Sequence, residues 1–364
     1  MDSRLCKEAL NRALHQIERS LDTDVDGFPH ITRNGCWQRT PEGSWTGGFG
    51  VGLLWLAHRL TGETRFASAA RAWLHRLEPR IEAEDADFDL GFLFYPSAAL
   101  GYQITGDNAL RGIALRAADC MRSFMHPQAR LIYCVYPQRA DFYGRTVGSS
   151  IIDVMANLQL LWWASAESGD LRYAEAANRH AERTLELLVR PDGSSFQVVD
   201  FDLETGQVLD RGTIHGFDDN ACWSRGQAWG IYGFALAAHE TGDPRFVQAV
   251  SHMSDYFLKR APEDRVPYWD FEDPAIPETV RDSSAAAITC AAWLLHCADI
   301  PGLQEYYAAG MQLLDTLCSD YLQAESSDGI LSHGCAYKKQ GVGIDEATIW
   351  GDYYFLQALF GRTN

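Results

Sequence analysis

The sequence lacks long apolar runs and is poor in positive charge. No uninterrupted hydrophobic stretch is long enough to cross a bilayer, and charged residues stand near the N-terminus, where a secretion signal needs its apolar centre. Lys and Arg number 31 against 49 Asp and Glu, which leaves a formal net charge of −18. Because such a surface repels nucleic acid and anionic membranes, we expect neither as a partner. The lack of a signal-peptide core and the singly placed cysteines predict a cytoplasmic protein.

The sequence also lacks the spacings that hold metals or cofactors. Its 9 cysteines stand singly with no Cys-x-x-Cys pair, and its 11 histidines show no His-Glu-x-x-His. The glycine-rich stretch at 47–52 fails the dinucleotide pattern, because Leu53 stands where the third glycine belongs. We therefore expect no disulfide framework and no metal site, and no dinucleotide-binding loop at 47–52.

A short turn recurs along the chain. A glycine at the end of a helix readily takes the left-handed conformation, and an acid after it suits the start of the next helix. Each copy therefore predicts the end of one helix and the start of another. The copies are Thr61-Gly62-Glu63, Thr105-Gly106-Asp107, Ser168-Gly169-Asp170 and Thr241-Gly242-Asp243, with a weaker one at Pro301-Gly302.

Long apolar segments alternate with amphipathic ones around these turns. The apolar segments predict buried helices and lie at 49–60, 90–104, 151–166, 227–239, 285–298 and 347–360. Amphipathic segments follow the turns, as at 65–77 and 172–188, and another opens the chain at 5–21. Six of each, with uneven spacing, favour a closed ring over an open solenoid. We predict an all-α fold, an (α/α)6 barrel of six inner and six outer helices, in which residues 1–364 form a single domain, with short strands allowed at 131–136 and 195–201.

The connections between the predicted helices are unequal in length. Those leading from inner to outer helices are tight, whereas those leading back to inner helices are long, at 22–46, 126–150, 190–222, 261–283 and 323–344. All the long ones must lie at one mouth of the barrel, where the inner helices begin. Long loops on a rigid scaffold commonly carry function, and helix N-termini attract anions. We therefore expect the functional site at this mouth, with local positive potential for an anionic ligand.

Several predicted inner helices begin with an acidic residue. Asp89 precedes the second and Asp153 lies at the start of the third. Asp282 precedes the fifth, and Asp345-Glu346 opens the sixth. Each residue alone is more simply a helix N-cap. Together they gather carboxyl groups at one opening, and a pair of carboxyl groups is typical of glycoside chemistry. In a poorly hydrated pocket one of them would have a raised pKa and could donate a proton.

The densest polar and aromatic stretch is at 215–229. Trp223 and Trp229 could offer flat faces to sugar rings, and Arg225 could bind a carboxylate in a fork. In the alternative interpretation, both tryptophans belong to the core and Arg225 pairs with Asp218 or Asp219. Composition alone leaves both open.

Six motifs occur in order between about Trp37 and Phe360. They are Asp89-Leu90-Gly91-Phe92, Ile151-Ile152-Asp153, Trp223-Ser224-Arg225-Gly226-Gln227-Ala228-Trp229, Pro267-Tyr268-Trp269-Asp270-Phe271, Arg281-Asp282-Ser283-Ser284-Ala285 and Trp350-Gly351-Asp352-Tyr353. Together they resemble the unsaturated glucuronyl hydrolases. The resemblance implies an (α/α)6 barrel that removes a Δ4,5-unsaturated glucuronic acid from the non-reducing end of lyase-generated, glycosaminoglycan-type oligosaccharides. The implied reaction hydrates the C4=C5 vinyl ether to a hemiketal, which opens and expels the rest of the saccharide without a metal or cofactor.

The resemblance also assigns residues. It implies that Asp153 is the acid/base that protonates C4 and then activates water, and that Asp89 is the second essential aspartate. The partner it implies is the unsaturated oligosaccharide, bound by a chain expected as a monomer or homodimer. The substrate-binding residues expected from it are Trp45, Gln197, His215, Trp223, Arg225 and Lys338.

The chain departs from the family pattern at three positions. Gln197 and His215 stand where the family usually has His and Gln, and Phe88 stands where a His often precedes the aspartate. These changes concern binding more than proton transfer, and they keep other readings open. One is an unsaturated rhamnogalacturonyl hydrolase acting on pectin fragments. Others are an N-acylglucosamine epimerase, which needs histidines that the inner-helix starts lack, and a catalytically degenerate saccharide-binding homologue.

Overall fold

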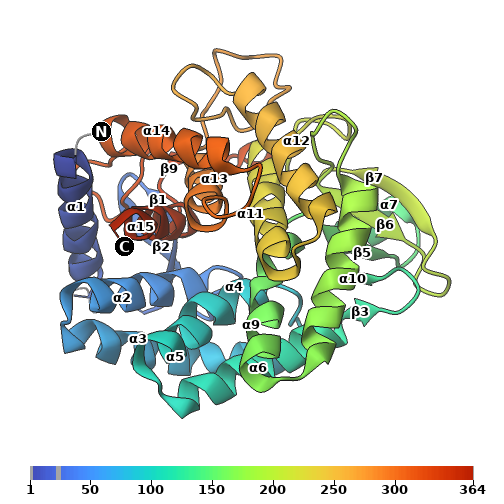
Figure 1. The fold of residues 1–364 in the computed structure, drawn as a ribbon, viewed down its shortest axis with the longest axis horizontal. Helices are drawn as coiled ribbons and strands as arrows, with labels where there is room; N and C mark the ends of the chain where they lie inside the picture. Colours follow the sequence, from blue (N-terminus) through green and yellow to red (C-terminus); the bar gives the residue numbers. More distant parts are fainter. Residues whose placement is uncertain (1–2, 22–25, 364) are drawn as a thin grey trace.

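The computed structural model describes residues 3–21 and 26–363, and its main helices form two concentric rings. The outer ring comprises α1 (Ser3–Leu21), α3 (Thr64–Leu77), α6 (Asn108–Ser123), α10 (Leu171–Leu188), α12 (Pro244–Arg260) and α14 (Gln304–Asp320). The inner ring comprises α2 (Gly47–Thr61), α4 with α5 (Leu90–Phe94 and Leu100–Thr105), α8 with α9 (Val154–Asn157 and Gln159–Ser168), α11 (Ser224–Thr241), α13 (Ser283–His296) and α15 (Ile349–Thr363). Figure 1 shows the outer helices following one another around the periphery in chain order. The predicted (α/α)6 barrel is confirmed.

The two rings differ in burial as the sequence pattern predicts. In the inner helix α11, every residue from Ser224 to Ala238 is buried. In the outer helix α10, buried positions such as Tyr173, Ala176, Ala177 and His180 recur at helical spacing, and the opposite face is exposed. A helix apolar on all sides belongs inside, and one with an apolar stripe belongs at the surface.

The recurring turn ends the inner helices in four cases. Each glycine takes the left-handed conformation, and an aspartate after it commonly caps the next helix. The φ angles are 73° at Gly62, 71° at Gly106, 77° at Gly169 and 68° at Gly242. The carboxylates of Asp107, Asp170 and Asp243 each accept a backbone N–H two residues later. The weaker fifth copy differs, because α13 ends at His296 and Gly302 lies in a longer connection before α14.

Two inner helices differ from the sequence prediction. The second is interrupted by a π-helical turn, Tyr95–Ala99, between α4 and α5. Pro96 lies in this turn, and a proline lacks the N–H that would donate to the preceding turn. The predicted third helix begins only at Val154, because Gly148–Ile151 forms strand β5.

The prediction that Asp345-Glu346 opens the last inner helix is wrong. Both residues belong to strand β9 (Val342–Glu346), and α15 begins at Ile349. The carboxylate of Glu346 accepts the Thr32 hydroxyl at 2.6 Å and the Asn34 backbone N–H at 3.0 Å. These bonds tie β9 to the first hairpin instead of capping a helix.

The long connections carry short antiparallel strands. They form the hairpin β1–β2 (Phe28–Arg33, Cys36–Thr40), the pair β3–β4 (Met125–His126, Leu131–Ile132), the sheet β5–β6–β7 (Gly148–Ile151, Val198–Phe201, Val208–Gly212) and the hairpin β8–β9, whose first strand is Gly334–Tyr337. The strands allowed at 131–136 and 195–201 are present in shorter form as β4 and β6. Residues 22–25 of the first predicted connection lie outside the described residues.

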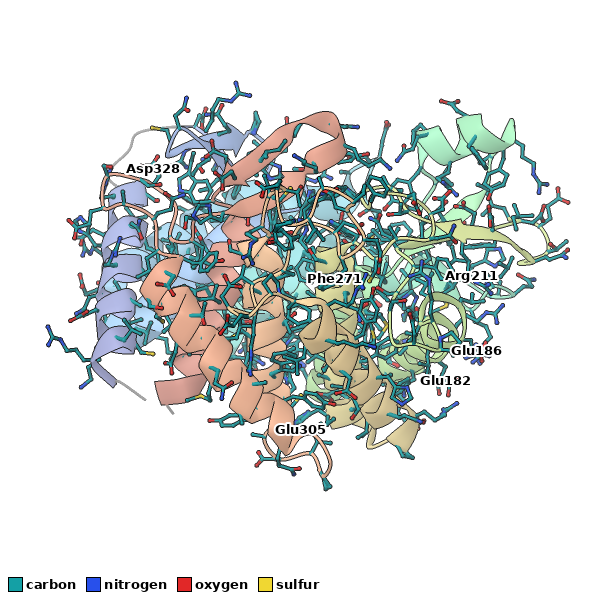
Figure 2. The ribbon with its side chains drawn as sticks, turned by 90° about the horizontal axis from the view of Figure 1, so that it is seen from above. Glu182, Glu186, Arg211, Phe271, Glu305 and Asp328 are labelled. Carbon is teal, nitrogen blue, oxygen red and sulfur yellow. The ribbon has the colours of Figure 1, made fainter. Side chains whose placement is uncertain are left out.

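The long connections and the tight turns lie at opposite ends of the barrel. Figure 2 shows Asp328, in the connection that leads to α15, at one end of the molecule. It shows Glu305, in the first turn of α14, at the other end. The prediction of one mouth built from the long connections agrees with this arrangement. Within the described part of the chain, no helix has the length and apolar character needed to span a bilayer.

Aromatic rings from four inner helices pack against one another inside the barrel. Phe92 of α4 lies 5.3 Å from Phe49 of α2 and 4.8 Å from Trp229 of α11, measured between ring centroids. Trp229 in turn lies 5.3 Å from Tyr354 of α15. All four side chains are buried. Trp229 therefore belongs to the core, as the alternative interpretation has it.

Candidate active site

Two of the acidic residues at inner-helix starts do not act as helix caps. Asp89 stands just before α4 and Asp153 just before α8, and neither side chain makes a capping hydrogen bond. Asp282 does cap α13, because its Oδ1 accepts the Ser284 N–H at 3.1 Å and the Ser284 hydroxyl at 2.5 Å. The capping interpretation therefore holds for Asp282 and fails for Asp89 and Asp153, whose carboxyl groups remain available for chemistry.

Asn157 fixes the two aspartates relative to each other. Its Oδ1 accepts the Phe92 N–H at 2.6 Å, and its Nδ2 donates to the carbonyl oxygen of Asp153 at 3.2 Å. The close approach needs Gly91, because a Cβ there would lie 2.5 Å from both the carbonyl oxygen and Oδ1 of Asn157. The starts of α4 and α8 are thus held together by one buried amide.

Replacing Gly91 with alanine should destabilise the protein by about 1–3 kcal/mol, because the new methyl group meets backbone that cannot swing aside. Gly112, in the outer helix α6, is the matched control, because a Cβ there would have no atom within 4 Å. Gly112→Ala should stabilise the protein by about 0.5–1 kcal/mol through helix propensity. Urea unfolding of both variants tests the contrast, and equal free energies of unfolding would contradict it.

Burial raises the pKa of both carboxyl groups. Asp153 is 9% exposed and its Oδ2 is buried without a hydrogen-bond partner among the described residues. Desolvation raises the pKa of Asp153 to about 7, against a smaller lowering by the charge of Arg225. Desolvation and the nearby charges of Asp87 and Asp153 raise the pKa of Asp89 well above its usual value. Carboxylic acid protons are therefore available here near neutral pH.

An open cavity adjoins Asp89. Its wall includes Trp45, which is half-buried, together with Arg80 and Asp87. The ring of Trp45 packs against the buried Trp350 at a centroid distance of 4.8 Å. An aromatic face, carboxylates and a guanidinium beside one opening are the groups that bind sugars and their acidic derivatives.

The buried side chain of Arg225 links three elements of the barrel. It is 2% exposed, and its Nη1 donates to Oδ2 of Asp282 at 2.7 Å. The same guanidinium donates to the carbonyl oxygens of Cys335, through Nη1, and of Ala336, through Nη2 at 2.6 Å. The alternative in which Arg225 pairs with Asp218 or Asp219 is wrong. The fork joins α11, α13 and β8, and it carries a positive charge beneath the mouth.

One cluster, made of Gln197, His215 and Trp223, packs against the Arg225 side chain. The His215 ring stacks on Trp223 with centroids 4.7 Å apart and planes 16° apart, and it lies 4.5 Å from the Tyr337 ring. Nε2 of Gln197 lies 2.6 Å from Nδ1 of His215. Trp223 is 5% exposed, so its ring supports the cluster and shows little open face. The two residue types that the chain exchanges relative to the family thus contact each other.

Phe88 and Lys338, which the sequence analysis also considered, are not part of this cluster. Phe88 is fully buried, so its side chain packs in the core. Lys338 begins a short 3-10 turn after β8. The pKa of Asp273 is lowered against desolvation by hydrogen bonds from Thr279, Ala275 and Trp269, and the charge of Lys338 adds a smaller lowering. The neighbouring Lys339, which the sequence analysis did not single out, helps to lower the pKa of His215.

Sequence reasoning missed three residues near the mouth. Asn157 is one of few polar side chains in an apolar helix, and that isolation was the available signal. Tyr136 lies where the charges of Asp89 and Asp153 add to the desolvation that raises the pKa of its phenol. His30 donates to or accepts from the Thr46 hydroxyl at 2.9 Å, and burial lowers its pKa to about 4. The last two gave no signal, because single tyrosines and histidines are common in loops.

Known proteins match the chain over nearly its whole length. The unsaturated glucuronyl hydrolase of Bacillus sp. strain GL1 is 35% identical over 97% of this chain and 95% of its own length. The unsaturated chondroitin disaccharide hydrolase of Streptococcus pneumoniae is 34% identical over 97% and 90%. A crystal structure of the Bacillus sp. GL1 enzyme, described as responsible for the degradation of glycosaminoglycan, has a TM-score of 0.91 at 34% identity and covers 98% of this chain and 96% of that chain.

No family model matches the chain. The identity to these relatives is nevertheless high enough, over nearly complete lengths, to settle descent, and the barrel agrees with theirs. The chain belongs to the unsaturated glucuronyl hydrolases.

Proposed function

We propose that this glycoside hydrolase removes Δ4,5-unsaturated glucuronic acid from the non-reducing end of lyase-generated, glycosaminoglycan-type oligosaccharides, with Asp153 and Asp89 as its reacting groups. The observation that supports these roles most directly is that both carboxyl groups are free of capping bonds. The relatives reported above are named for glucuronyl and chondroitin substrates, and nothing favours the rhamnogalacturonyl or non-catalytic alternatives.

The reaction consists of proton transfer and addition of water. Asp153 as the acid protonates C4, and positive charge develops at C5 and the ring oxygen. The resulting Asp153 carboxylate takes a proton from water as the hydroxyl adds to C5. The hemiketal so formed opens at C5, and the freed C1 releases the remaining saccharide. A carboxyl group whose pKa is raised to about 7 by burial can carry, at neutral pH, the proton that C4 receives. It takes a proton from water in the second step and is therefore protonated again at the end of each turnover.

The neighbouring residues suit binding of an anionic sugar. Asp89 can hold ring hydroxyls and support the charge at C5. The half-buried Trp45 can lie against the sugar ring. The Arg225 guanidinium and Lys339 place positive charge near the site in a chain of net charge −18. We also propose that the enzyme acts in the cytoplasm, because no disulfide joins the cysteines of the described residues. Its proposed state there is a monomer or homodimer.

Ultraviolet absorbance of the conjugated alkene-carboxylate tests the activity directly. The purified protein is mixed with unsaturated disaccharides from chondroitin, hyaluronan, heparin and gellan. We expect absorbance to fall as the partner sugar is released. A fall in absorbance with pectin-derived fragments alone would favour the rhamnogalacturonyl enzyme. Saccharide binding without turnover would favour the degenerate homologue.

The rate should fall as pH rises above about 7. The general acid must be protonated, and burial raises the pKa of Asp153 to about 7 in the folded protein. On the alkaline side kcat/KM should therefore drop about tenfold for each pH unit. A profile of kcat/KM from pH 5 to 9 checks this. A rate that rises through this range would mean that the deprotonated form of Asp153 is the active one.

A further inference from the structure

The side-chain amide of Gln197 has a fixed orientation. Its Oε1 accepts three hydrogen bonds, from the Thr213 hydroxyl at 2.8 Å and from the backbone N–H groups of Ile214 and His215 at 2.7 Å each. Backbone N–H groups can only donate, so the oxygen must face them. The amide nitrogen is thereby turned toward His215, whose Nδ1 lies 2.6 Å away.

This orientation determines where the histidine proton sits. The amide nitrogen of Gln197 only donates, so Nδ1 of His215 must accept and cannot carry a proton. A neutral imidazole with an accepting Nδ1 carries its proton on Nε2. Nε2 makes no hydrogen bond within the described chain and is not sealed from solvent. That N–H is therefore free to donate to a ligand.

The ring is held in place on other sides as well. Trp223 stacks on it and Tyr337 packs against it, and the Tyr337 hydroxyl donates to the Ile214 carbonyl oxygen at 3.1 Å. The Gln197 backbone is anchored beside the acid, because its carbonyl oxygen accepts the N–H of Ile152 at 2.9 Å. Ile152 directly precedes Asp153, so the amide and the proton donor share one support.

From these contacts we infer that Gln197 is a positioning residue that fixes His215 as a neutral imidazole with its proton on Nε2, aimed at a saccharide oxygen as a hydrogen-bond donor. The inference rests on the proposed function for its ligand. It explains the exchange of residue types relative to the family, because a Gln side chain and an Nε2-protonated His both present an N–H donor. It also implies that binding by His215 does not titrate where histidine ordinarily does.

The charged groups around His215 support the neutral form. Burial, together with the positive charges of Arg225 and Lys339, lowers the pKa of His215 to about 3. Two aspartates contact the loop that carries His215: Asp219 accepts the Thr213 N–H, and Asp270 accepts the Phe217 N–H. Burial raises the pKa of Asp270 to about 6, so it titrates in wild type and variants alike.

Gln197→Glu is the decisive variant. A carboxylate accepts at both oxygens, so Nδ1 must then carry a proton. At low pH the imidazolium keeps Nε2–H and binding survives. At high pH the neutral ring keeps its one proton on Nδ1, and Nε2 becomes an acceptor. The ratio of kcat/KM for Gln197→Glu to that for wild type should therefore fall at least about tenfold between about pH 5.5 and 8.5.

The ratio isolates this effect from the rest of the site. Ionisation of Asp153 and Asp270 affects both proteins and cancels. A purely electrostatic effect of the new carboxylate has the opposite sign, because it raises the pKa of Asp153 and makes the ratio rise with pH. The matched control is Thr213→Val, which removes one bond to the same Oε1 and leaves the amide. Its ratio to wild type should be flat with pH. A flat or rising ratio for Gln197→Glu would overturn the inference.

A measurement on the wild-type protein tests the proton position without catalysis. In protein labelled with ¹⁵N-histidine, the His215 signals are identified by their loss in His215→Gln. We expect a neutral ring with its proton on Nε2 from about pH 5 to 8. Titration within this range, or a proton on Nδ1, would refute the assignment even if the variant does not fold. An inactive wild type with the expected tautomer would instead count against the proposed function alone.

Discussion

Asp153→Asn should lose at least about a thousandfold in kcat/KM while keeping its fold. The residue is proposed to give a proton to C4 and to take one from water, and an amide can do neither. General acid–base catalysis alone contributes about 10²–10⁴-fold, and here one group performs both steps. The absorbance assay on the preferred disaccharide measures the loss. An Asp153→Asn enzyme with a near wild-type rate would show that Asp153 is not the general acid/base.

The same variant should be more stable than wild type at alkaline pH. In wild type, burial raises the pKa of Asp153 from an ordinary value near 4 to about 7. The folded state then binds a proton that the unfolded state releases, so the stability contributed by this group falls as pH rises from about 4 to 7. An amide does not ionise. Asp153→Asn should therefore match wild type below about pH 4 and gain up to about 4 kcal/mol above pH 7.

Asp352 provides the contrasting buried aspartate. Burial also raises its pKa to about 7, but its two oxygens accept the N–H groups of Ile330 at 2.8 Å and Leu331 at 2.9 Å. Asparagine has one oxygen for two donors, so Asp352→Asn should lose about 1–3 kcal/mol even at acidic pH. Urea unfolding at about pH 5 and pH 8 compares the two variants. An Asp153→Asn protein that is destabilised like Asp352→Asn would show that Asp153 has a structural role.

The barrel could be predicted because its signals are local. Four inner helices end in a turn that needs a left-handed residue, at Gly62, Gly106, Gly169 and Gly242, and each turn is recognisable from a three-residue motif. Apolar character on every side of a segment such as 227–239 likewise reports burial without knowledge of its neighbours. The interruption at Pro96 was equally local, but a proline can bend, end or bulge a helix, and the sequence does not say which.

The partners of the acidic residues could not be predicted, because they come from distant segments. Asp89, Asp153 and Asp282 look alike at helix starts, and only the structure shows that Asp282 caps while the others do not. Arg225 has two acids within seven residues, yet it pairs with one 57 positions away. Asp345 fell in a strand because β8 supplied a pairing edge. Long-range pairing of this kind is fixed by packing, which leaves no pattern in the neighbouring sequence.

Arg225→Met should destabilise the protein by about 3–5 kcal/mol, the cost of leaving a buried charge without its partner. Asp282 is fully buried, and its Oδ2 would lose the guanidinium that lies 2.7 Å away. The carbonyl oxygens of Cys335 and Ala336 would lose their donors at the same time. Lysine should recover only part of the loss, because one ammonium cannot reach a carboxylate and two carbonyls in a planar fork.

A second substitution separates the charge from the packing. In Arg225→Met with Asp282→Asn, the asparagine oxygen can still cap Ser284, and no uncompensated charge remains. The double variant should therefore be more stable than Arg225→Met alone, although Asp282→Asn by itself is destabilising, because it leaves the guanidinium unpaired. Urea unfolding of the four proteins gives the coupling energy, which should be at least about 1.5 kcal/mol for a desolvated pair. Additive losses would mean that Arg225 stabilises the barrel through packing on Trp223 and Trp350, whose ring centroids lie 4.3 and 5.3 Å from its guanidinium carbon.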